Sequence, residues 1–385
     1  MQSSSGVYQR CKIKNGGTPV IVVTDIGRDI DDAIALVTLA SLKRMCILNP
    51  LAVIVTLAPE EDRACLARVT LDSLGLHDIP IGVGSDGGCK GGIELDCFQC
   101  VYGTNKRTFH FESGASLMSR ILNEVEEPNS VKLVCISSLK DVSSLIKHEK
   151  DLFFSKIQEV VIMGGATYSQ DREQLIPDET AYNNHCDIDA ATYVYEECQK
   201  NKLSTTTITR HAAYGCPFPS SFLENLQDTH HILASEICSA NLSAMNKLWT
   251  KVNLPPGSDE REKLPERCDR DWFLNFFRVK QDDSSFNWED SSVVYFYDPF
   301  AILHCVEAYR EIHFSPKCYK VHGVVHRITG VPETDEDCSG ILNKENLIKE
   351  IAEMLHQAFT LSLTKAFSAK VNLGKMKKYT KEGED

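Results

Sequence analysis

The sequence lacks the features of a membrane protein, a repeat protein or a nucleic-acid-binding protein. No apolar run reaches the roughly 18 residues that a membrane-spanning helix needs, and there is no internal repeat or low-complexity linker. Basic residues are outnumbered, with 41 Lys and Arg against 54 Asp and Glu. The resulting net charge of −13 argues against nucleic acid or an anionic membrane as a partner. We therefore expect one continuous globular domain that binds neither.

We also expect no secretory signal, because the first residues of the sequence are polar. The 15 cysteines are an odd number, and many of them, such as Cys135 and Cys305, have apolar neighbours. Both observations favour buried free thiols in a reducing compartment, so we expect a cytoplasmic protein. Cys97 and Cys100 form a lone C-x-x-C pair, whereas a zinc ribbon would require a second pair at matching spacing.

The sequence does contain a regular alternation of apolar strands and helices. Strands are expected at residues 20–24, 51–57, 79–84, 131–137, 158–165 and 204–209, with one or two more within 316–331. Helices are expected at residues 31–44, 60–74, 113–124, 139–148, 187–200 and 344–368. This alternation predicts a doubly wound α/β fold, with a mostly parallel sheet flanked by helices. We expect a single large domain over residues 18–369, between a polar lead (1–17) and a charged, frayed tail (370–385).

An acidic run follows the first expected strand. Its four aspartates are Asp25, Asp29, Asp31 and Asp32. They lie between an apolar strand and an apolar helix, at the kind of turn where open α/β sheets place their sites. Two carboxylates ~4 Å apart repel by roughly 1 kcal/mol in water and roughly 4 kcal/mol at an effective dielectric of about 20. The run therefore needs a cation, a raised pKa or full solvation, and oxygen ligands favour Ca²⁺ or Mg²⁺. A solvated loop or a helix cap is the alternative, which the isoleucines within the run disfavour.

Four segments, in this order, resemble the signatures of the inosine–uridine-preferring nucleoside hydrolase family. They are the aspartate turn, the strand and glycine turn at 161–166, the segment 183–191 and the segment 297–301. The resemblance covers about residues 18 to 310. It implies a doubly wound α/β fold with one bound Ca²⁺, which hydrolyses the N-glycosidic bond of ribonucleosides to free base and ribose. It also implies a small-molecule nucleoside as the partner, and a homo-oligomer remains open.

The resemblance also implies roles for single residues. It assigns calcium binding to Asp32, Asp298 and the backbone carbonyl of Ile136. It assigns substrate binding to Asp31, Met163, Asn183 and Asn184. Asp25 resembles the residue that binds calcium and deprotonates the attacking water, and Asp29 is the alternative for both tasks.

Ordinary structural roles are the alternatives for several of these residues. Asp298 precedes Pro299 and also fits a helix N-cap. Asn183 also fits a loop or cap position, and Met163 also fits the core. Trp249, Trp272 and Phe273 lie in an aromatic, mostly helical region that we expect to cover the pocket, with core packing as the alternative for each.

Three positions depart from the family pattern. Val23 replaces an aspartate, Ala181 stands where a ribose-binding Glu is common, and Tyr297 stands where many members carry the His that protonates the leaving base. A tyrosine can donate a hydrogen bond, although its usual pKa of about 10 makes it a weaker acid at neutral pH. We expect Tyr297 to take this catalytic role. His211 is a second candidate contact to the base or leaving group, with a structural histidine as the alternative.

Two other functions remain open at this point. The departures from the pattern are compatible with a Ca²⁺-stabilised nucleoside-binding protein that has no turnover. A Mg²⁺-dependent phosphatase could also use an aspartate turn. That pattern requires a second aspartate two residues after the first, and Gly27 occupies this position after Asp25.

Overall fold

The computed structural model describes residues 16–27, 29–89, 109–262, 264, 266–279, 291–332 and 338–381. Cys97, Cys100 and most of the expected polar lead lie outside these residues.

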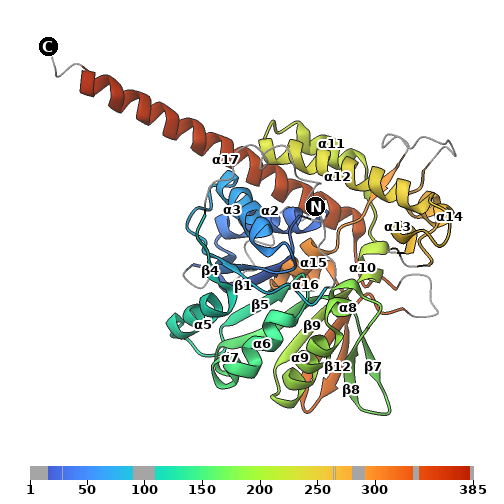
Figure 1. Ribbon diagram of the computed structural model, residues 1–385. Coiled ribbons are helices and arrows are strands. Elements are labelled where there is room, and N and C mark those ends of the chain that lie inside the picture. The colour runs from blue at the N-terminus through green and yellow to red at the C-terminus, as the bar shows by residue number, and fades with distance from the viewer. Residues whose placement is uncertain are drawn as a thin grey trace.

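A nine-stranded sheet forms the centre, in the order β12-β13-β9-β6-β5-β1-β2-β3-β4 (Figure 1). In this order the strands span Lys317–Val321, Val324–Thr329, Ser204–Thr209, Ile157–Gly164, Val131–Cys135, Thr18–Thr24, Leu48–Val55, Ile81–Val83 and Glu112–Ser113. Neighbouring strands are parallel except β12 and β13, which confirms the predicted doubly wound, mostly parallel sheet.

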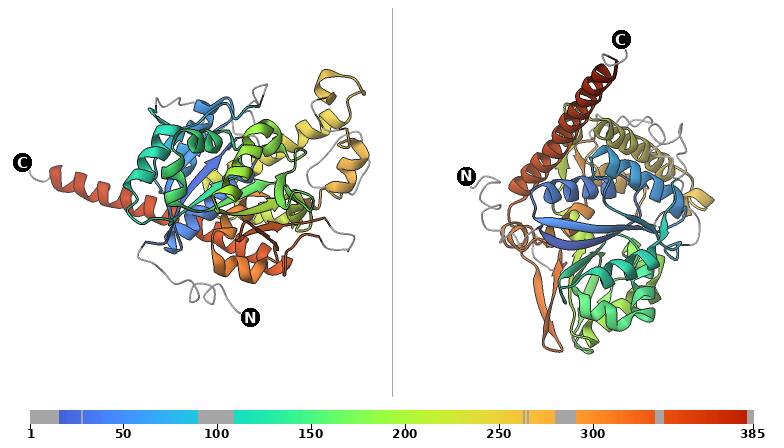
Figure 2. Two further views of the ribbon diagram at one scale, coloured as in Figure 1. Left: turned by 90° about the horizontal axis from the view of Figure 1, so that it is seen from below. Right: turned by 90° about the vertical axis from the view of Figure 1, so that its left-hand side faces the viewer.

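Helices cover both faces of the sheet. Helix α2 (Asp31–Arg44) lies on one face, where α15 (Asp298–His304) and α17 (Lys344–Lys381) both pack against it. Helices α5 (Gly114–Glu124), α6 (Lys140–His148) and α9 (Ile188–Lys200) lie on the other face. The right-hand view of Figure 2 shows the blue strands β1 and β2 between these two layers. Each layer closes its own apolar cluster against the sheet.

Further helices and two small sheets complete the described chain. The remaining helices are α3 (Glu60–Ser73), α7 (Lys150–Lys156), α8 (Tyr182–Cys186), α10 (Arg210–Tyr214), α11 (Ser221–Gln227), α12 (Ile232–Val252), α13 (Asp259–Glu262), α14 (Arg270–Phe276) and α16 (Glu307–His313). Two small antiparallel sheets pair β7 (Ala166–Ser169) with β8 (Gln174–Pro177), and β10 (Phe218–Pro219) with β11 (Val293–Val294). Within the described residues, no helix combines the length and the apolar character needed to cross a membrane.

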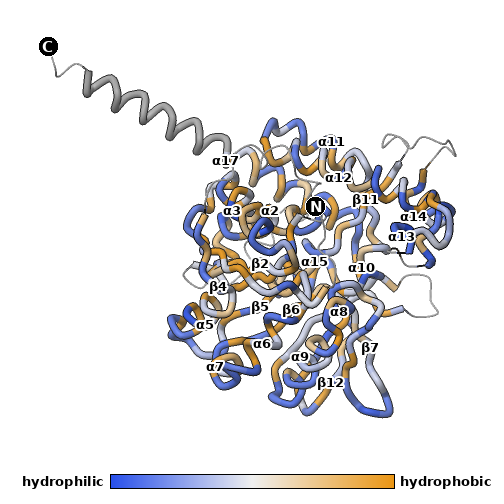
Figure 3. Tube along the Cα trace, in the orientation of Figure 1, coloured by the Kyte–Doolittle hydropathy of each residue, from blue (hydrophilic) through white to orange (hydrophobic). Residues whose placement is uncertain are grey.

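The central strands form because they are apolar on both faces. In β1, β5 and β6 nearly every residue is buried, as near-continuous runs of Val, Ile and Leu require in a parallel sheet covered on both sides. The hydropathy colouring shows these strands as the apolar centre of the molecule (Figure 3). Their polar continuations therefore emerge at the carboxyl ends of the strands.

The order of the strands fixes the place of a site. From β1 the chain proceeds through β2 and β3 to one edge of the sheet, whereas β5, β6 and β9 extend to the other edge. The direction changes between β1 and β5, which are direct neighbours. In an open α/β sheet a crevice forms at such a switch point, beyond the carboxyl ends of the strands. The aspartate turn follows β1 at this point.

The structure moves some expected boundaries. Strand β2 begins at Leu48 rather than residue 51, because the register with β1 shifts beside Pro50, and an irregular ladder tolerates a residue without an N–H group. Residues 317–329 form two strands, and the second joins the main sheet beside β9. Helix α17 continues to Lys381, so the helix does not end at 368 and most of the tail expected to be frayed is helical.

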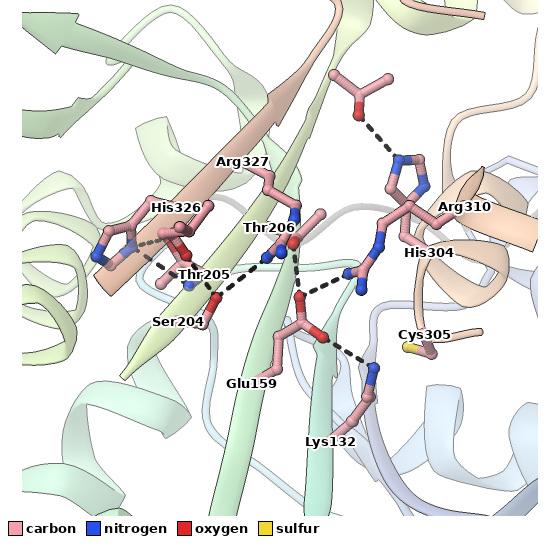
Figure 4. A network of polar contacts seen from close by, with 12 residues as sticks. Lys132, Glu159, Ser204, Thr205, Thr206, His304, Cys305, Arg310, His326 and Arg327 are labelled. Atoms are coloured by element: carbon pink, nitrogen blue, oxygen red, sulfur yellow. Dashed lines mark hydrogen bonds and ion pairs between the residues drawn. The ribbon is translucent and has the colours of Figure 1, made fainter. Parts of the chain in front are cut away.

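A buried ion-pair network lies near the amino ends of β5 and β6 (Figure 4). Because β1 and β5 are parallel, this is the end of the sheet opposite to the aspartate turn. The Lys132 Nζ and Arg310 Nη1 atoms each lie 2.9 Å from a different carboxylate oxygen of Glu159. The hydroxyl of Thr206 also donates to Glu159, at 2.6 Å. Burial alone would raise the pKa of Glu159, but the two neighbouring cations outweigh it and lower this pKa to about 2. Glu159 is therefore a fully compensated buried charge.

Candidate active site

The aspartate turn begins where β1 ends, at Thr24. Asp25, Asp31 and Asp32 are buried, whereas Asp29 is exposed. Gly27 has a φ of +121°, a conformation that residues with a side chain rarely adopt. The turn therefore keeps three carboxylates inside and leaves one in contact with solvent. This placement favours Asp25 over Asp29 as the residue of the interior site.

Asp32 is held against the end of β1. Its Oδ1 atom accepts hydrogen bonds from the hydroxyl of Thr24 and, at 3.2 Å, from the backbone N–H of Asp25. These bonds point the first turn of α2 back toward the strand that precedes it. The second carboxylate oxygen of Asp32 takes no part in them.

Asp31 joins the aspartate turn to a segment far away in the sequence. Its carboxylate accepts hydrogen bonds from the backbone N–H of Tyr297, at 2.9 and 3.1 Å, and from that of Asp298, at 3.4 Å. Asp31 thus satisfies the free N–H groups at the start of α15. Tyr297 occupies the N-cap position, so Asp298 is not the N-cap considered as its alternative role, and Pro299 follows in the first turn.

The buried carboxylates repel one another. Burial raises the pKa of Asp31, Asp32 and Asp298 well above the usual range, and the neighbouring carboxylates raise it further. The charges of Asp31 and Asp32 both raise the pKa of Asp298. The structure therefore brings together residues that are far apart in the sequence. A bound cation would remove this repulsion, because it would favour the ionised form of each carboxylate.

The donor chemistry fits a hard divalent cation. Asp25, Asp32 and Asp298 supply buried carboxylates, and Ile136 follows β5 with its N–H bonded to Val23 of β1 at 2.9 Å. This hydrogen bond places Ile136 beside the end of β1. Among the described residues, however, no group of three or more His, Cys, Asp or Glu side chains is already arranged at metal-binding distances. The acidic residues are therefore gathered, but not in a preformed coordination sphere.

Two asparagines support the neighbouring strand β6. The Nδ2 of Asn183 donates to the carbonyl of Met163, at 2.9 Å, near the carboxyl end of β6. The Nδ2 of Asn184 donates to the carbonyls of Gly165 and Asp178, both at 2.9 Å, and its side chain is fully buried. Asn183 is only partly buried, so its amide oxygen is the better placed of the two to meet a ligand.

Aromatic rings surround Tyr297. The ring of Tyr214 meets those of Tyr297 and His211 edge-on, each with centroids 6.2 Å apart. Removal of its hydroxyl from water raises the pKa of Tyr297 well above the usual range, and Tyr214 and Asp31 add to this effect. Burial lowers the pKa of His211, as does Arg210 beside it, so this imidazole is neutral at pH 7.

The aromatic residues expected to cover the pocket fall into two groups, one in a buried apolar cluster and one in a ladder of stacked rings. Trp249 and Phe273 are buried in a satellite apolar cluster, which supports their alternative role in core packing. Trp272 stacks on Phe276, and Phe276 stacks on Tyr295 at 4.2 Å. The ring of Phe276 also meets Tyr214, at 4.9 Å, so this ladder continues to the neighbourhood of Tyr297.

Comparison with known proteins adds to this geometry. The family model described as inosine-uridine preferring nucleoside hydrolase matches residues 20–352. The chain belongs to the inosine-uridine preferring nucleoside hydrolase family. Its resemblance to this family is thereby confirmed, and the family consists of hydrolases that act on N-glycosyl bonds and depend on a metal ion, commonly calcium. No curated protein matches the sequence significantly.

Solved structures share the fold of this family member at low identity. The type III effector protein XopQ, in complex with adenosine diphosphate ribose, is 21% identical with a TM-score of 0.73, and the match covers 93% of this chain and 99% of the effector. A purine-preferring ribonucleoside hydrolase from Gardnerella vaginalis is 11% identical with a TM-score of 0.59, over 89% and 99% of the two chains. An inosine-uridine preferring nucleoside hydrolase from Bacillus anthracis is 14% identical with a TM-score of 0.54, over 88% and 99%.

Sequence reasoning missed one residue beside the site of this nucleoside hydrolase family member. Arg63 of α3 is fully buried, and its Nη1 donates to the carbonyls of Asp25 and Ile26. The available signal was an arginine on the apolar face of an amphipathic helix, next to the buried Ala64 and Ala67. Such a residue is almost never fully buried unless it has a specific partner.

Proposed function

We propose that this protein hydrolyses the N-glycosidic bond of ribonucleosides to free base and ribose in a Ca²⁺-dependent reaction. The observation that carries the proposal is the group of buried carboxylates Asp25, Asp31, Asp32 and Asp298 at the switch point of the sheet. Their position within a nucleoside hydrolase chain supports this reaction over phosphate-ester hydrolysis.

Each residue has a task that its surroundings favour. Asp25 accepts a proton from the attacking water, and Asp31 and Asn183 bind the hydroxyls of the ribose. The buried carboxylates stabilise the positive charge that develops on the ribose as the bond to the base breaks. Tyr297 donates a hydrogen bond to the leaving base. Neutral His211 offers a further hydrogen bond at the edge of the pocket.

Asp25, Asp32, Asp298 and the carbonyl of Ile136 would hold the Ca²⁺ ion. When bound, the ion would lower the pKa of a water molecule and anchor the ribose hydroxyls. Asp29 is exposed, and its Oδ1 accepts a hydrogen bond from the N–H of Asp31 at 3.2 Å, so we assign it no role in binding the ion. Met163 lines the ribose side of the site, and Asn184 supports the turn behind it.

The first experiment is to measure reducing-sugar release from a panel of purine and pyrimidine ribonucleosides, with Ca²⁺ and with a chelator. We expect ribose to appear only in the presence of the metal. Release that persists at full rate in the chelator would contradict calcium dependence. Release of phosphate from generic phosphomonoesters, with no ribose from any nucleoside, would favour the Mg²⁺-dependent phosphatase instead.

Binding without turnover is the second candidate function. Ala181 and Tyr297 replace residues that hold ribose and protonate the base in the family pattern, and the XopQ structure contains adenosine diphosphate ribose. Calorimetric titration with inosine, with uridine and with adenosine diphosphate ribose separates the two candidates. Saturable binding of an intact ligand, together with no ribose release over hours, would favour the binding protein.

We also propose that the protein acts in the cytoplasm. All twelve cysteines in the described part of the chain are free thiols, and six of them are buried. A reducing compartment preserves such thiols. Fluorescence imaging of the tagged full chain checks this location, and localisation to a secretory compartment would contradict it.

A further inference from the structure

Arg63 lies under the aspartate turn and is completely enclosed, with an exposed fraction of 0%. Its Nη1 donates to two successive carbonyls of the turn, that of Asp25 and, at 3.1 Å, that of Ile26. Its Nε and Nη2 atoms are buried and have no hydrogen-bond partner among the described residues. The guanidinium is therefore attached to the backbone of the very residue that we propose as the base.

A buried guanidinium needs a compensating negative charge, because carbonyl groups solvate it only partly. Buried carboxylates of the aspartate turn belong to Asp25, Asp31 and Asp32, and Arg63 donates to the backbone carbonyl of Asp25. The benefit is mutual. A fixed positive charge beneath the turn would offset part of the repulsion among Asp25, Asp31 and Asp32.

We propose that Arg63 is a positioning residue for this reaction. It holds the turn that carries Asp25 and supplies a permanent positive charge beneath the acidic group. The guanidinium suits this task because its Nη1 donates to both carbonyls and because it stays charged at every physiological pH. The assignment rests on the proposed role of Asp25 for its effect on turnover, but its effect on the charge of the turn is independent of that role.

The same helix offers a matched control. Arg68, five residues further along α3, also donates to two carbonyls, those of Leu76 and Ile79, both at 2.7 Å. Its third acceptor is the carboxylate of Asp72, at 2.8 Å. Arg68 thus has a similar bonding pattern, but its partners belong to the end of α3 and the loop before β3. A substitution there reports the general cost of losing a structural arginine from this helix.

The first test compares the steady-state kinetics of Arg63→Gln and Arg68→Gln, well below the melting temperature of the less stable variant. We expect Arg63→Gln to lower kcat about 10- to 100-fold, the range found when residues behind a metal or catalytic group are removed. KM should change little, because the contacts to ribose remain. Arg68→Gln should retain the wild-type kcat. Equal kcat for the two variants would overturn the proposal.

A second test needs neither turnover nor metal. In chelator, the melting temperature is measured for the wild type, for Arg63→Gln, for Asp25→Asn and for the double variant. A control cycle repeats these measurements with Arg68→Gln in the place of Arg63→Gln. Asp25→Asn should raise the melting temperature more in the Arg63→Gln background, by about 2–4 °C, because the guanidinium no longer attracts the carboxylate there. Additive shifts in both cycles would overturn the proposal.

The two tests also separate this inference from the proposed function. If the wild-type protein releases no ribose, the proposed reaction fails, and the thermal cycle alone decides the role of Arg63. If Arg63→Gln does not fold, Arg63→Lys replaces it in the kinetic test and Arg63→Met, which also removes the charge, replaces it in the thermal cycle. The lysine keeps the charge, but its amine ends one bond short of the Nη1 position, so we expect a reduced kcat. Wild-type kcat in Arg63→Lys would overturn the positioning role.

Discussion

Glu159 and Asp32 are both buried carboxylates beside the central sheet, yet their pKa values move in opposite directions. Glu159 lies between Lys132 and Arg310, and its pKa falls to about 2 (Figure 4). Asp32 lies among other aspartates, and its pKa rises well above the usual range. Neighbouring cations favour the ionised form of a buried carboxylate, whereas like charges gathered at a switch point favour a bound proton or a bound cation. The difference distinguishes a structural group from a functional one.

The largest expected effect is the loss of turnover when the charge of Asp32 is removed. Asp32→Asn keeps an oxygen that can accept the hydrogen bonds from Thr24 and Asp25, but it removes the negative charge. We expect kcat to fall by about 10³-fold. The melting temperature of the metal-free protein should not fall, because one repulsive charge has gone. Asp228→Asn, at an exposed position after α11, is the control for both measurements. A clear loss of metal-free stability in Asp32→Asn would contradict the comparison.

Substitution of Glu159 should have the opposite effect, with a loss of stability and no loss of turnover. Glu159→Gln leaves the charges of Lys132 and Arg310 buried without their partner, and we expect a loss of about 3–5 kcal/mol in the free energy of unfolding. Urea unfolding measures this loss. Glu112→Gln, which breaks an exposed pair with Arg120, should cost less than about 1 kcal/mol. Turnover by the folded Glu159→Gln protein should be unchanged.

The pH dependence of stability sharpens the same comparison. The pKa of Glu159 is about 2 in the folded protein, whereas an unperturbed glutamate has a pKa of 4.5, so the folded state favours the ionised form. Its contribution, about 3 kcal/mol, is therefore complete above pH ~4.5 and disappears as the pH falls toward 2. Urea unfolding of the wild type and of Glu159→Gln across this window should give curves that converge at low pH. A constant difference between the two proteins would show that the ion pair is not its source.

The smallest expected effect on turnover concerns the hydrogen bond to the leaving nucleobase. Tyr297→Phe keeps the ring beside Tyr214 but removes the hydroxyl, and we expect kcat to fall by about 10²-fold, the lower end for a general acid, or about 2.7 kcal/mol. Tyr295→Phe is the matched control, because its hydroxyl donates to the carbonyl of Phe276 at 2.8 Å. Wild-type kcat in Tyr297→Phe would assign the donation to another group.

Local patterns in the sequence were enough to predict the sheet and the aspartate turn. The four aspartates are close together in the chain, and the apolar strand before them identifies their position without any tertiary contact. The boundaries of α2 and β9 agree with the expected ranges. An apolar run defines α2, and β9 consists almost entirely of β-branched residues, which favour strands.

The contacts that complete each charged group were not predictable in this way. Arg310 and Glu159 are 151 residues apart, and nothing near either residue specifies the other. Arg63 and Asp25 are 38 residues apart and meet only because α3 packs beside the first strands. Lys132 and Glu159 did carry a signal, since charged residues within apolar strands need partners, but the sequence pattern could not identify those partners.

The bond from Asp31 to the start of α15 has a consequence for biosynthesis. Its acceptor and its donor at Tyr297 are 266 residues apart. A nascent chain that has emerged only as far as β9 already holds the whole aspartate turn, but neither Asp298 nor the N–H groups that restrain Asp31. The ribosome must therefore deliver the chain as far as Asp298 before the acidic centre exists. A prematurely terminated product would lack a functional centre even if its first strands had already assembled.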